Sequence, residues 1–450
     1  MTIRRYRSAP RMLALAAALC CSVPAWSLDL AQAYRLAEAN DATIRAARAA
    51  AAAGREQLPQ ARSQFFPNIS AGVSRARNTL ATTQPNFLGQ IVTQHDKYRS
   101  ANDALTLRQP IYNKQISAQY HRAVAGVADA NAQLERDEEN LVMRVTQAYF
   151  EALLAQEQLR LIRLQETNYT TAADAARKSF AAGAGTRTDI EDAQARLDLA
   201  RAQEVEARQN IEITQRQLQV LINQPTLEPL APIDTSKLKL EPPQPATIGQ
   251  WMALAEAASP ELRSARAQVD VAKADVERAE AGHYPTLNAV AQISRSLSEN
   301  PTTIHAEYDQ KQIALQLNIP IWQGGYVNSQ VRQAVAVQQQ AEDKLDELRR
   351  DLGVRVQREF SGMNDGVAKV KALEQAVQSA QQSVESSRKS FEAGARTRLD
   401  ILNAEAQAGQ ARHDLAQARF AYLVARVRLT ALAGGLKAQN IDEINGWLQH

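Results

Sequence analysis

Two fourteen-residue segments of this chain share residues that can end one helix and begin the next. RKSFAAGAGTRTDI at 177–190 and RKSFEAGARTRLDI at 388–401 match at eleven positions. A glycine can end a helix in the left-handed conformation, and a threonine with an acid three residues later can form a capping box. The spacing therefore predicts two tight turns between helices, which share the same three residue types: Gly183, Thr186 and Asp189, and Gly394, Thr397 and Asp400.

The other polar residues show no spacing typical of a catalytic, metal or cofactor site. The six histidines lack the spacing of metal ligands, and no Ser/His/Asp set is recognisable. Gly324-Gly325 follows a predicted strand, but no GxGxxG or P-loop pattern surrounds it. We therefore expect no enzyme, no bound metal and no cofactor.

The first 27 residues have the organisation of a secretory signal peptide. Four arginines precede the apolar run 12–21, and Pro24-Ala25-Trp26-Ser27 follows it. A membrane anchor is the alternative, but it needs about 20 apolar residues, and this run has ten. We predict a signal peptide, 1–27, that is cleaved after Ser27.

Removal of the signal peptide changes the charge and the cysteine content. The peptide carries four arginines and no acid, so the net charge changes from +3 to 3 − 4 = −1. Nucleic-acid binding thereby loses its main support, and we expect no nucleic-acid partner. Cys20 and Cys21 leave with the peptide, so the mature chain has no disulfide and no cysteine metal site. Leu19 before Cys20 fits a lipoprotein signal poorly.

The composition favours long helices over a thick core. Aromatic residues make up only 5% of the chain, whereas alanine, glutamine and charged residues dominate, as in helical proteins with narrow apolar seams. After residue 27 no apolar run approaches the length of a membrane-spanning helix. The mature protein is therefore either soluble in the periplasm or spans a membrane as a β-barrel.

The chain repeats one plan twice. The residues LAEANDATIRAARA at 36–49 resemble LAEAASPELRSARA at 254–267, and LTLRQPIY at 105–112 resembles LQLNIPIW at 315–322. Self-similarity of this kind indicates an internal structural repeat. We predict a first repeat, a Pro-rich connector, a second repeat and a C-terminal tail, at 28–224, 225–246, 247–435 and 436–450.

Each repeat alternates helix-like and strand-like segments. An unbroken helix of about 68 residues would be roughly 100 Å long, and two shorter helices, stacked end to end, match its length. This arrangement predicts a long antiparallel helical layer. The expected helices are 29–64, 113–182 and 186–221 in the first repeat and 248–282, 327–393 and 397–433 in the second.

Four stretches between the helices alternate apolar and polar residues with the period of a strand. The clearest is 312–322, where isoleucines and leucines alternate with glutamine and asparagine. Prolines suit the joints between strand and helix because they lack a donor and fix φ; they are Pro67, Pro110, Pro285 and Pro320.

A half-solvated soluble sheet and a membrane barrel with a wet lumen both explain this alternation. The signal peptide and the missing membrane-spanning helix favour the barrel. Four strands cannot close a membrane barrel, because small ones have at least eight. Three copies of the chain would supply 4 × 3 = 12 strands.

The element order helix–strand–strand–helix–helix, given twice with F-x-x-G-x-x-T-x-x-D-I at each turn between helices, resembles the TolC family of outer-membrane channel proteins. This resemblance implies a mainly α fold with a transmembrane β-barrel. It implies a homotrimer whose 12-stranded barrel, in outer-membrane lipid of a Gram-negative bacterium, continues as a long periplasmic α-helical barrel. It also implies a passive duct that takes substrate from an inner-membrane pump through a periplasmic adaptor protein.

The resemblance also implies roles for residues near the two turns. The turns themselves, with Gly183, Thr186, Gly394 and Thr397, are the expected hairpin tips for adaptor docking. The expected periplasmic entrance contains five residues. Asp400 lines it as a ring of carboxylates, and Asn403 stands where many members have a second acid. Arg396 links the two hairpins through Asp189, and Phe391 stands where some members have a tyrosine.

Two questions remain open in the sequence. Small-molecule efflux and one-step protein secretion use the same duct, so the pump is either an ABC transporter or a proton-driven transporter. A soluble periplasmic coiled-coil adaptor is the alternative from another class, and the four strand signals count against it. We also expect loops near 78–97 and 297–307 to face outside the cell.

Overall fold

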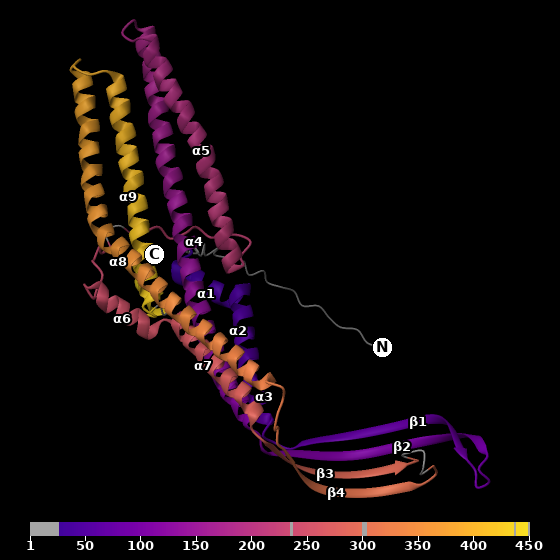
Figure 1. Ribbon diagram of the computed structural model, residues 1–450. Helices are drawn as coiled ribbons and strands as arrows, with labels where there is room; N and C mark the ends of the chain where they lie inside the picture. The colour runs from indigo at the N-terminus through magenta and orange to yellow at the C-terminus, as the bar shows by residue number, and fades with distance from the viewer. Residues whose placement is uncertain (1–26, 235–236, 299–303, 436–437, 449–450) are drawn as a thin grey trace, which may run out of the picture.

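The computed structural model describes residues 27–234, 237–298, 304–435 and 438–448. The predicted signal peptide therefore lies outside the described residues, apart from Ser27. Two pairs of long helices form one end of an elongated molecule, and a small sheet projects from the other end (Figure 1).

The two halves of the chain have the same order of elements. The first half contains α1 (Leu30–Asn40), α2 (Ala42–Arg55), α3 (Gln57–Ser63), β1 (Asn68–Pro85), β2 (Ile91–Tyr112), α4 (Lys114–Ala181) and α5 (Arg187–Ile222). The second half contains α6 (Ile248–Ala258), α7 (Pro260–Glu280), the 3-10 turn η1 (Ala281–His283), β3 (Thr286–Leu297), β4 (Glu307–Asn318), α8 (Tyr326–Glu392) and α9 (Arg398–Leu432), followed by α10 (Ala438–Asn445).

The long helices match the sequence prediction closely. Helix α4 has 68 residues and α8 has 67, so each is about 100 Å long. Helices α1, α2 and α3 pack along one end of α4, and α5 packs along the other end. The predicted long helical layer is confirmed. No helix among the described residues is long and apolar enough to cross a membrane.

The two expected helices 29–64 and 248–282 are each broken, which corrects the prediction. The first divides at Asp41 and at Glu56. The extended backbone of Asp41 stops α1, and its carboxylate accepts a hydrogen bond from the Ile44 N–H at 2.9 Å. The second divides at Ser259, which precedes Pro260. A residue before proline disfavours the helical conformation, and proline suits the first position of the next helix.

The core lies where the two long pairs of helices diverge. Tyr149 of α4 and Tyr422 of α9 are fully buried there. The Tyr149 hydroxyl donates to the backbone oxygens of Leu28 and Ala231, at 2.9 and 3.1 Å, and Tyr422 donates to Glu241 O at 2.9 Å. The bonds to Ala231 and Glu241 attach the connector between the two repeats to the helices.

The sheet has the order β1-β2-β3-β4, with every pair antiparallel. Residues that face one another across antiparallel strands share a face of the sheet, and one face is apolar near the helices. One row is Ile69, Leu107, Ala291 and Ile313. The next row is Ala71, Leu105 and Ile293, and it ends on β4 with a charged residue, Lys311. The opposite face carries Ser70, Thr106, Gln292 and Gln312.

The first hairpin is longer than expected. Residues 78–97, predicted as a loop, are mostly strand, and the turn is confined to 86–90 between β1 and β2. Polar cross-strand pairs stabilise this extension without an apolar pattern: Asn78 donates to Ser100 Oγ, and the Thr83 and Thr93 hydroxyls are bonded, both at 2.9 Å. The second loop joins β3 to β4, and 299–303 within it lie outside the described residues.

The four prolines do not all occupy the same kind of position. Pro67 and Pro285 directly precede β1 and β3, and Pro320 lies between β4 and α8. Pro110 lies inside β2, where the register with β3 shifts between Pro110 and Tyr112. The irregularity accommodates the missing donor of this proline, so the strand continues two residues beyond the predicted joint.

Candidate functional site

Each hairpin tip ends its incoming helix with a left-handed glycine, as predicted. Gly183 has φ +74° and Gly394 has φ +75°. The Gly183 N–H donates to Phe180 O at 2.9 Å, and the Gly394 N–H donates to Phe391 O at 2.9 Å. The two tips therefore repeat one backbone structure, and a side chain at either glycine would be strained.

Each outgoing helix begins with the predicted capping box. The Asp189 N–H donates to Thr186 Oγ1 at 3.2 Å, and the Asp400 N–H donates to Thr397 Oγ1 at 3.3 Å. In return, both carboxylates accept hydrogen bonds from the backbone N–H and the hydroxyl of their threonine. These bonds lower the pKa of both aspartates, so both are ionised at neutral pH.

Arg396 contacts its own hairpin in the structure of one chain. Its Nη1 donates to Ser387 Oγ of α8 at 2.8 Å, and Ser387 is fully buried. Among the residues that the structure describes, no ion pair joins Arg396 to Asp189. The nearby cation that lowers the Asp189 pKa is Arg398, after the two bonds from Thr186. The Arg396–Asp189 link between hairpins stays a prediction.

Phe391 and Arg398 form a contact that the sequence did not reveal. The Arg398 guanidinium carbon lies 5.2 Å from the centre of the Phe391 ring, a cation–π distance. The Phe391 ring therefore contacts this arginine beside the tip. The family resemblance places a tyrosine at this position in some members. Both residues belong to the repeated segment, but the counterpart of Arg398, Arg187, pairs with Glu191, so the repeat carried no signal for this contact.

A direct hydrogen bond joins the two hairpins just behind the tips. Arg196 Nη2 of α5 donates to Asn403 Oδ1 of α9 at 2.6 Å. Asn403 was expected only to weaken the charge of an entrance, whereas here it accepts a bond from the other hairpin. Arg196 was missed, because no pattern in the sequence connects residues 207 positions apart.

A second contact recurs at the repeat offset of 211 residues. Arg177 Nη2 donates to Gln194 Oε1 at 2.7 Å in the first hairpin, and Arg388 Nη2 contacts Glu405 Oε1 at 2.5 Å in the second. These pairs lie 17 residues apart in sequence and join the incoming to the outgoing helix. The repeat thus preserves the contact while one copy becomes an ion pair.

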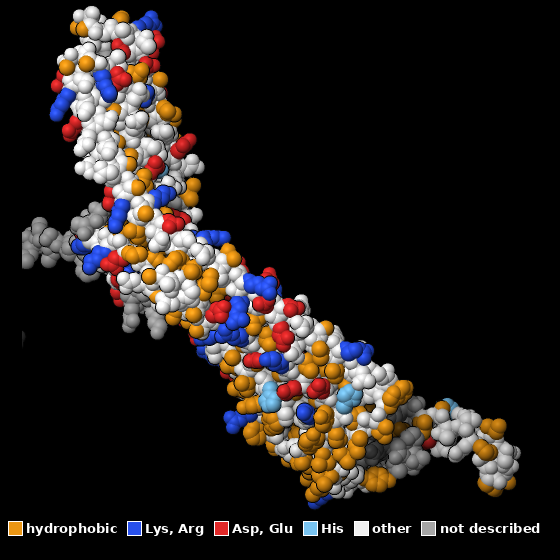
Figure 2. Space-filling model, turned by 60° about the vertical axis from the view of Figure 1, so that its left-hand side comes forward, with side chains coloured by type: hydrophobic (Ala, Val, Ile, Leu, Met, Phe, Trp, Pro, Cys, Tyr) orange, Lys and Arg blue, Asp and Glu red, His pale blue; other side chains and the backbone are white. Residues whose placement is uncertain are grey.

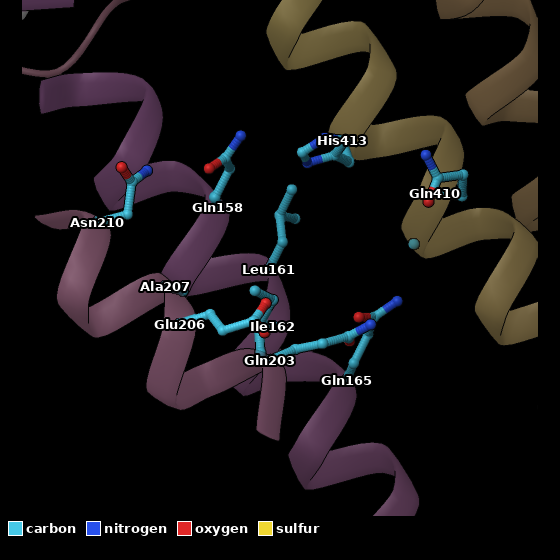
Figure 3. Close-up of a pocket in the computed structure, with 11 residues that line it drawn as sticks. Gln158, Leu161, Ile162, Gln165, Gln203, Glu206, Ala207, Asn210, Gln410 and His413 are labelled. Carbon is cyan, nitrogen blue, oxygen red and sulfur yellow. The ribbon is translucent and has the colours of Figure 1, made fainter. Parts of the chain in front are cut away.

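A polar cavity of about 350 Å³ separates the two hairpins further from the tips (Figure 3). His413 and Gln410 of α9 face Gln158 and Gln165 of α4 across it. At Gly409 a Cβ would overlap the Gln165 side chain, so the glycine permits the close approach of α9 to α4. No group of acidic, histidine or cysteine side chains in the described part of the chain could hold a metal ion.

The other functional surface is the apolar face of the sheet. Its side chains are exposed in the single chain: Ile313 is 90% exposed. Figure 2 shows hydrophobic side chains gathered where the helices approach the strands. Six exposed aromatic residues lie at or near this junction: Phe65, Phe66, Tyr112, Tyr284, Trp322 and Tyr326. Such aromatic girdles mark the membrane–water interface of membrane-spanning strands.

Charged residues mark the other edge of the apolar band. Lys311 is the β4 member of the row that contains Ala71, Leu105 and Ile293, and the next row contains Asp103 and Arg295. Tyr112 and Asp103 are nine residues apart, or about 30 Å along the strand. With the usual strand tilt of 35–45°, this span is about 23 Å high, close to the ~25 Å apolar band of membrane barrels.

Comparison with known proteins shows the family to which the chain belongs. The sequence model of the family described as "Outer membrane efflux protein" matches residues 33–224 and 251–435. The chain is 33% identical to the alkaline protease secretion protein AprF of Pseudomonas aeruginosa, over 93% of this chain and 87% of that protein. It is 30% identical to the proteases secretion protein PrtF of Dickeya chrysanthemi, over 94% and 92%. It is 28% identical to the outer membrane protein TolC of Escherichia coli, over 93% and 85%.

Solved structures share the fold at lower sequence identity. A structure of CusC superposes with a TM-score of 0.78 at 17% identity, over 91% of this chain and 93% of that chain. The outer membrane protein VceC of Vibrio cholerae superposes with a TM-score of 0.77 at 17% identity, over 90% and 96%. The fold class expected from the sequence is thereby confirmed.

Proposed function

This chain belongs to the outer membrane efflux protein family and is an outer-membrane export channel, and from that premise we propose that it is the passive duct of a tripartite protein-secretion system. An inner-membrane transporter supplies the energy, and a periplasmic adaptor protein connects that transporter to the hairpin tips. The sequence contains no nucleotide-binding pattern, and we infer that the chain catalyses no reaction, in keeping with a family of channel proteins.

The observation that carries this proposal is the apolar band on one face of the sheet. Ile313 and Leu315 of β4 are exposed to solvent in the isolated chain. Burial of such side chains in lipid is favourable by about 25 cal/mol per Å². The aromatic girdle near the helices then lies at the periplasmic interface, and the first hairpin lies on the outer side.

The duct is a homotrimer in this proposal. One chain supplies four strands, and its edge strands β1 and β4 have no neighbour on their outer sides within the described chain. Lipid cannot satisfy the backbone groups of an open edge. Three chains give 4 × 3 = 12 strands, which exceeds the minimum of about eight for a closed membrane barrel. The long helices α4 and α8 continue the barrel into the periplasm.

The exported substrate is proposed to be a protein. Two relatives that are at least 30% identical over more than nine-tenths of the chain are named for the secretion of proteases. This similarity favours protein secretion over small-molecule efflux, which the sequence had left open. Of the two kinds of pump that the sequence left open, we infer an ABC transporter as the energy source for a protein substrate.

The hairpin tips form the periplasmic entrance in this proposal. Asp400 uses Oδ2 for both of its bonds to Thr397, so Oδ1 is available to face the aperture. Three copies would form a ring of carboxylates that attracts cations. Arg396 would contact Asp189 of a neighbouring hairpin when the trimer assembles, and the tips with Gly183 and Gly394 would contact the adaptor.

Expression in a strain that lacks its own protease-secretion channel tests the function. With the cognate ABC transporter and adaptor present, this chain is expected to restore protease to the medium. A matched variant with Ile313→Asp and Leu315→Asp, which places charges in the apolar band, should be absent from the outer membrane. Restoration of drug resistance without secretion of protease would favour the efflux alternative.

A further inference from the structure

The first hairpin carries a group of cations on the same face as the apolar band. Arg77 lies directly opposite Arg99, and Lys97 lies one row further toward the turn, opposite Thr79. All three cations are exposed. They occupy odd-numbered positions, as Ile69 does, so their side chains share its face.

Two arginines directly opposite each other repel, since cross-strand like charges destabilise a sheet. Two arginines nearer the apolar band are instead paired with acids. Arg75 forms two bonds to Asp103, at 2.6 and 2.8 Å, and Arg295 pairs with acids of β4. In contrast, none of the described acids forms an ion pair with Arg77, Lys97 or Arg99.

The charge on this hairpin is also one-sided. From Arg77 to Arg99, the odd-numbered positions contain no acid. The one acid in this span is Asp96, which lies on the opposite face and accepts a bond from Gln94 Nε2 at 3.0 Å. The outward face of the hairpin therefore bears three cations without a counter-charge on the same face.

We propose that Arg77, Lys97 and Arg99, the outward cationic surface, bind the phosphate groups of a phosphorylated lipid headgroup in the outer leaflet, the chemistry that lipopolysaccharide presents. The proposal depends on insertion of the sheet in the orientation given above. Arg99 lies four residues beyond Asp103, about 13 Å along the strand and about 10 Å along the membrane normal at the usual tilt. That position is at the headgroup layer, above the apolar band.

The chemistry of the three side chains fits a phosphate group. Arginine presents a planar fork that binds two phosphate oxygens at once, and lysine adds a point charge. A bound phosphate between Arg77 and Arg99 would turn their repulsion into attraction to a shared anion. A trimer would carry 3 × 3 = 9 such cations around its outer rim.

Binding of rough lipopolysaccharide to the detergent-purified, full-length mature trimer tests the proposal. The triple variant Arg77→Gln, Lys97→Gln and Arg99→Gln should bind about a hundredfold more weakly, the scale for loss of three cations at an anionic lipid surface. The double variant Arg77→Lys and Arg99→Lys should bind within about tenfold of the parent. Arg108→Gln removes a cation of the same hairpin from the opposite face and should change nothing.

Two further arms use the parent protein alone, so they hold even if the triple variant assembles poorly. Dephosphorylated lipopolysaccharide should bind much more weakly than the intact lipid, and millimolar inorganic phosphate should not raise the melting temperature of the trimer as the intact lipid does. Equal binding by the triple variant and the parent, undiminished binding of the dephosphorylated lipid, or full replacement by inorganic phosphate would each overturn the proposal. Trimer assembly and channel conductance, measured on the same samples, report separately on the proposed function.

Discussion

Arg196 Nη2 and Asn403 Oδ1 lie 2.6 Å apart and connect the two helical hairpins of one chain just behind their tips. Arg196 is a cation and Asn403 is a neutral amide, so only the donor of this hydrogen bond is charged. Asn403 is the repeat counterpart of Asp192, at the offset of 211 residues. The second hairpin thus has an amide where the first has an acid.

Replacement of Asn403 by aspartate should tighten the connection between the hairpins. The new carboxylate would form an ion pair with Arg196, whereas Arg196→Gln would leave only a weak neutral bond. We expect Asn403→Asp to lower single-channel conductance and Arg196→Gln to raise it, by about twofold or more in planar bilayers. If both variants conduct like the parent, the two hairpins do not move apart at this contact.

Asp400 has a charge and a capping role, and two substitutions separate them. Asp400→Asn keeps an acceptor for the Thr397 bonds and removes the charge, and Asp400→Ala removes both. Both variants should reduce cation over anion selectivity, measured as a reversal potential in a salt gradient. Only Asp400→Ala should also lower stability, by ~1 kcal/mol for the lost hydrogen bond from the Thr397 N–H. Selectivity unchanged in both variants would show that Asp400 is a helix cap alone.

Gly394 and Gly353 should respond in opposite ways to alanine. Gly394 has a φ of +75°, which an L side chain rarely adopts, so Gly394→Ala should destabilise the hairpin by about 1 kcal/mol. Gly353 lies inside α8, where a Cβ would meet no atom within 4 Å. Gly353→Ala should stabilise the protein by up to ~1 kcal/mol. Chemical denaturation of the trimer checks both signs, and a neutral Gly394→Ala would disprove the need for a glycine at the tip.

Glu139 makes stability depend on pH near neutrality. Burial raises its pKa to about 7, with Arg263 opposing the shift and Glu135 adding to it. The pKa of Glu139 in the folded protein lies above the ordinary value of 4.5. The protonated carboxyl therefore contributes its full stability below pH 4.5, and this contribution is lost as the pH rises through 7. The Glu139→Gln variant should therefore have a higher melting temperature than the parent at pH 8. At pH 5 the two melting temperatures should lie closer together. The same difference at both values would exclude titration of Glu139 as the cause.

The repeat made the helices and tips predictable, because each prediction had two independent copies. The glycines and capping boxes at 183–189 and 394–400 follow from local backbone chemistry alone, and the structure has them as predicted. The break at Asp41 was missed because it lies in an alanine-rich segment with strong helix propensity, where one capping side chain outweighs the neighbouring residues.

Long-range polar contacts were the main omission. The bond between Arg196 and Asn403 joins separate helices, and nothing in the local sequence encodes it. The strand extension 78–97 was missed for a related reason: its stability comes from polar pairs such as Asn78 with Ser100, which lack the apolar alternation used to recognise strands. In both cases the folded structure, and not a local sequence pattern, determines which polar side chains contact each other.

The most direct test of the account is a cysteine scan along β4 in intact outer membranes, since both native cysteines belong to the predicted signal peptide. A membrane-impermeant thiol reagent should label single cysteines at Gln310, Gln312 and Gln316, whose face would line a water-filled lumen. Cysteines at Ile313, Leu315 and Leu317 should stay unlabelled until detergent is added, because that face would contact lipid. Uniform labelling of all six positions would contradict insertion of the sheet into the outer membrane, and with it the proposed duct.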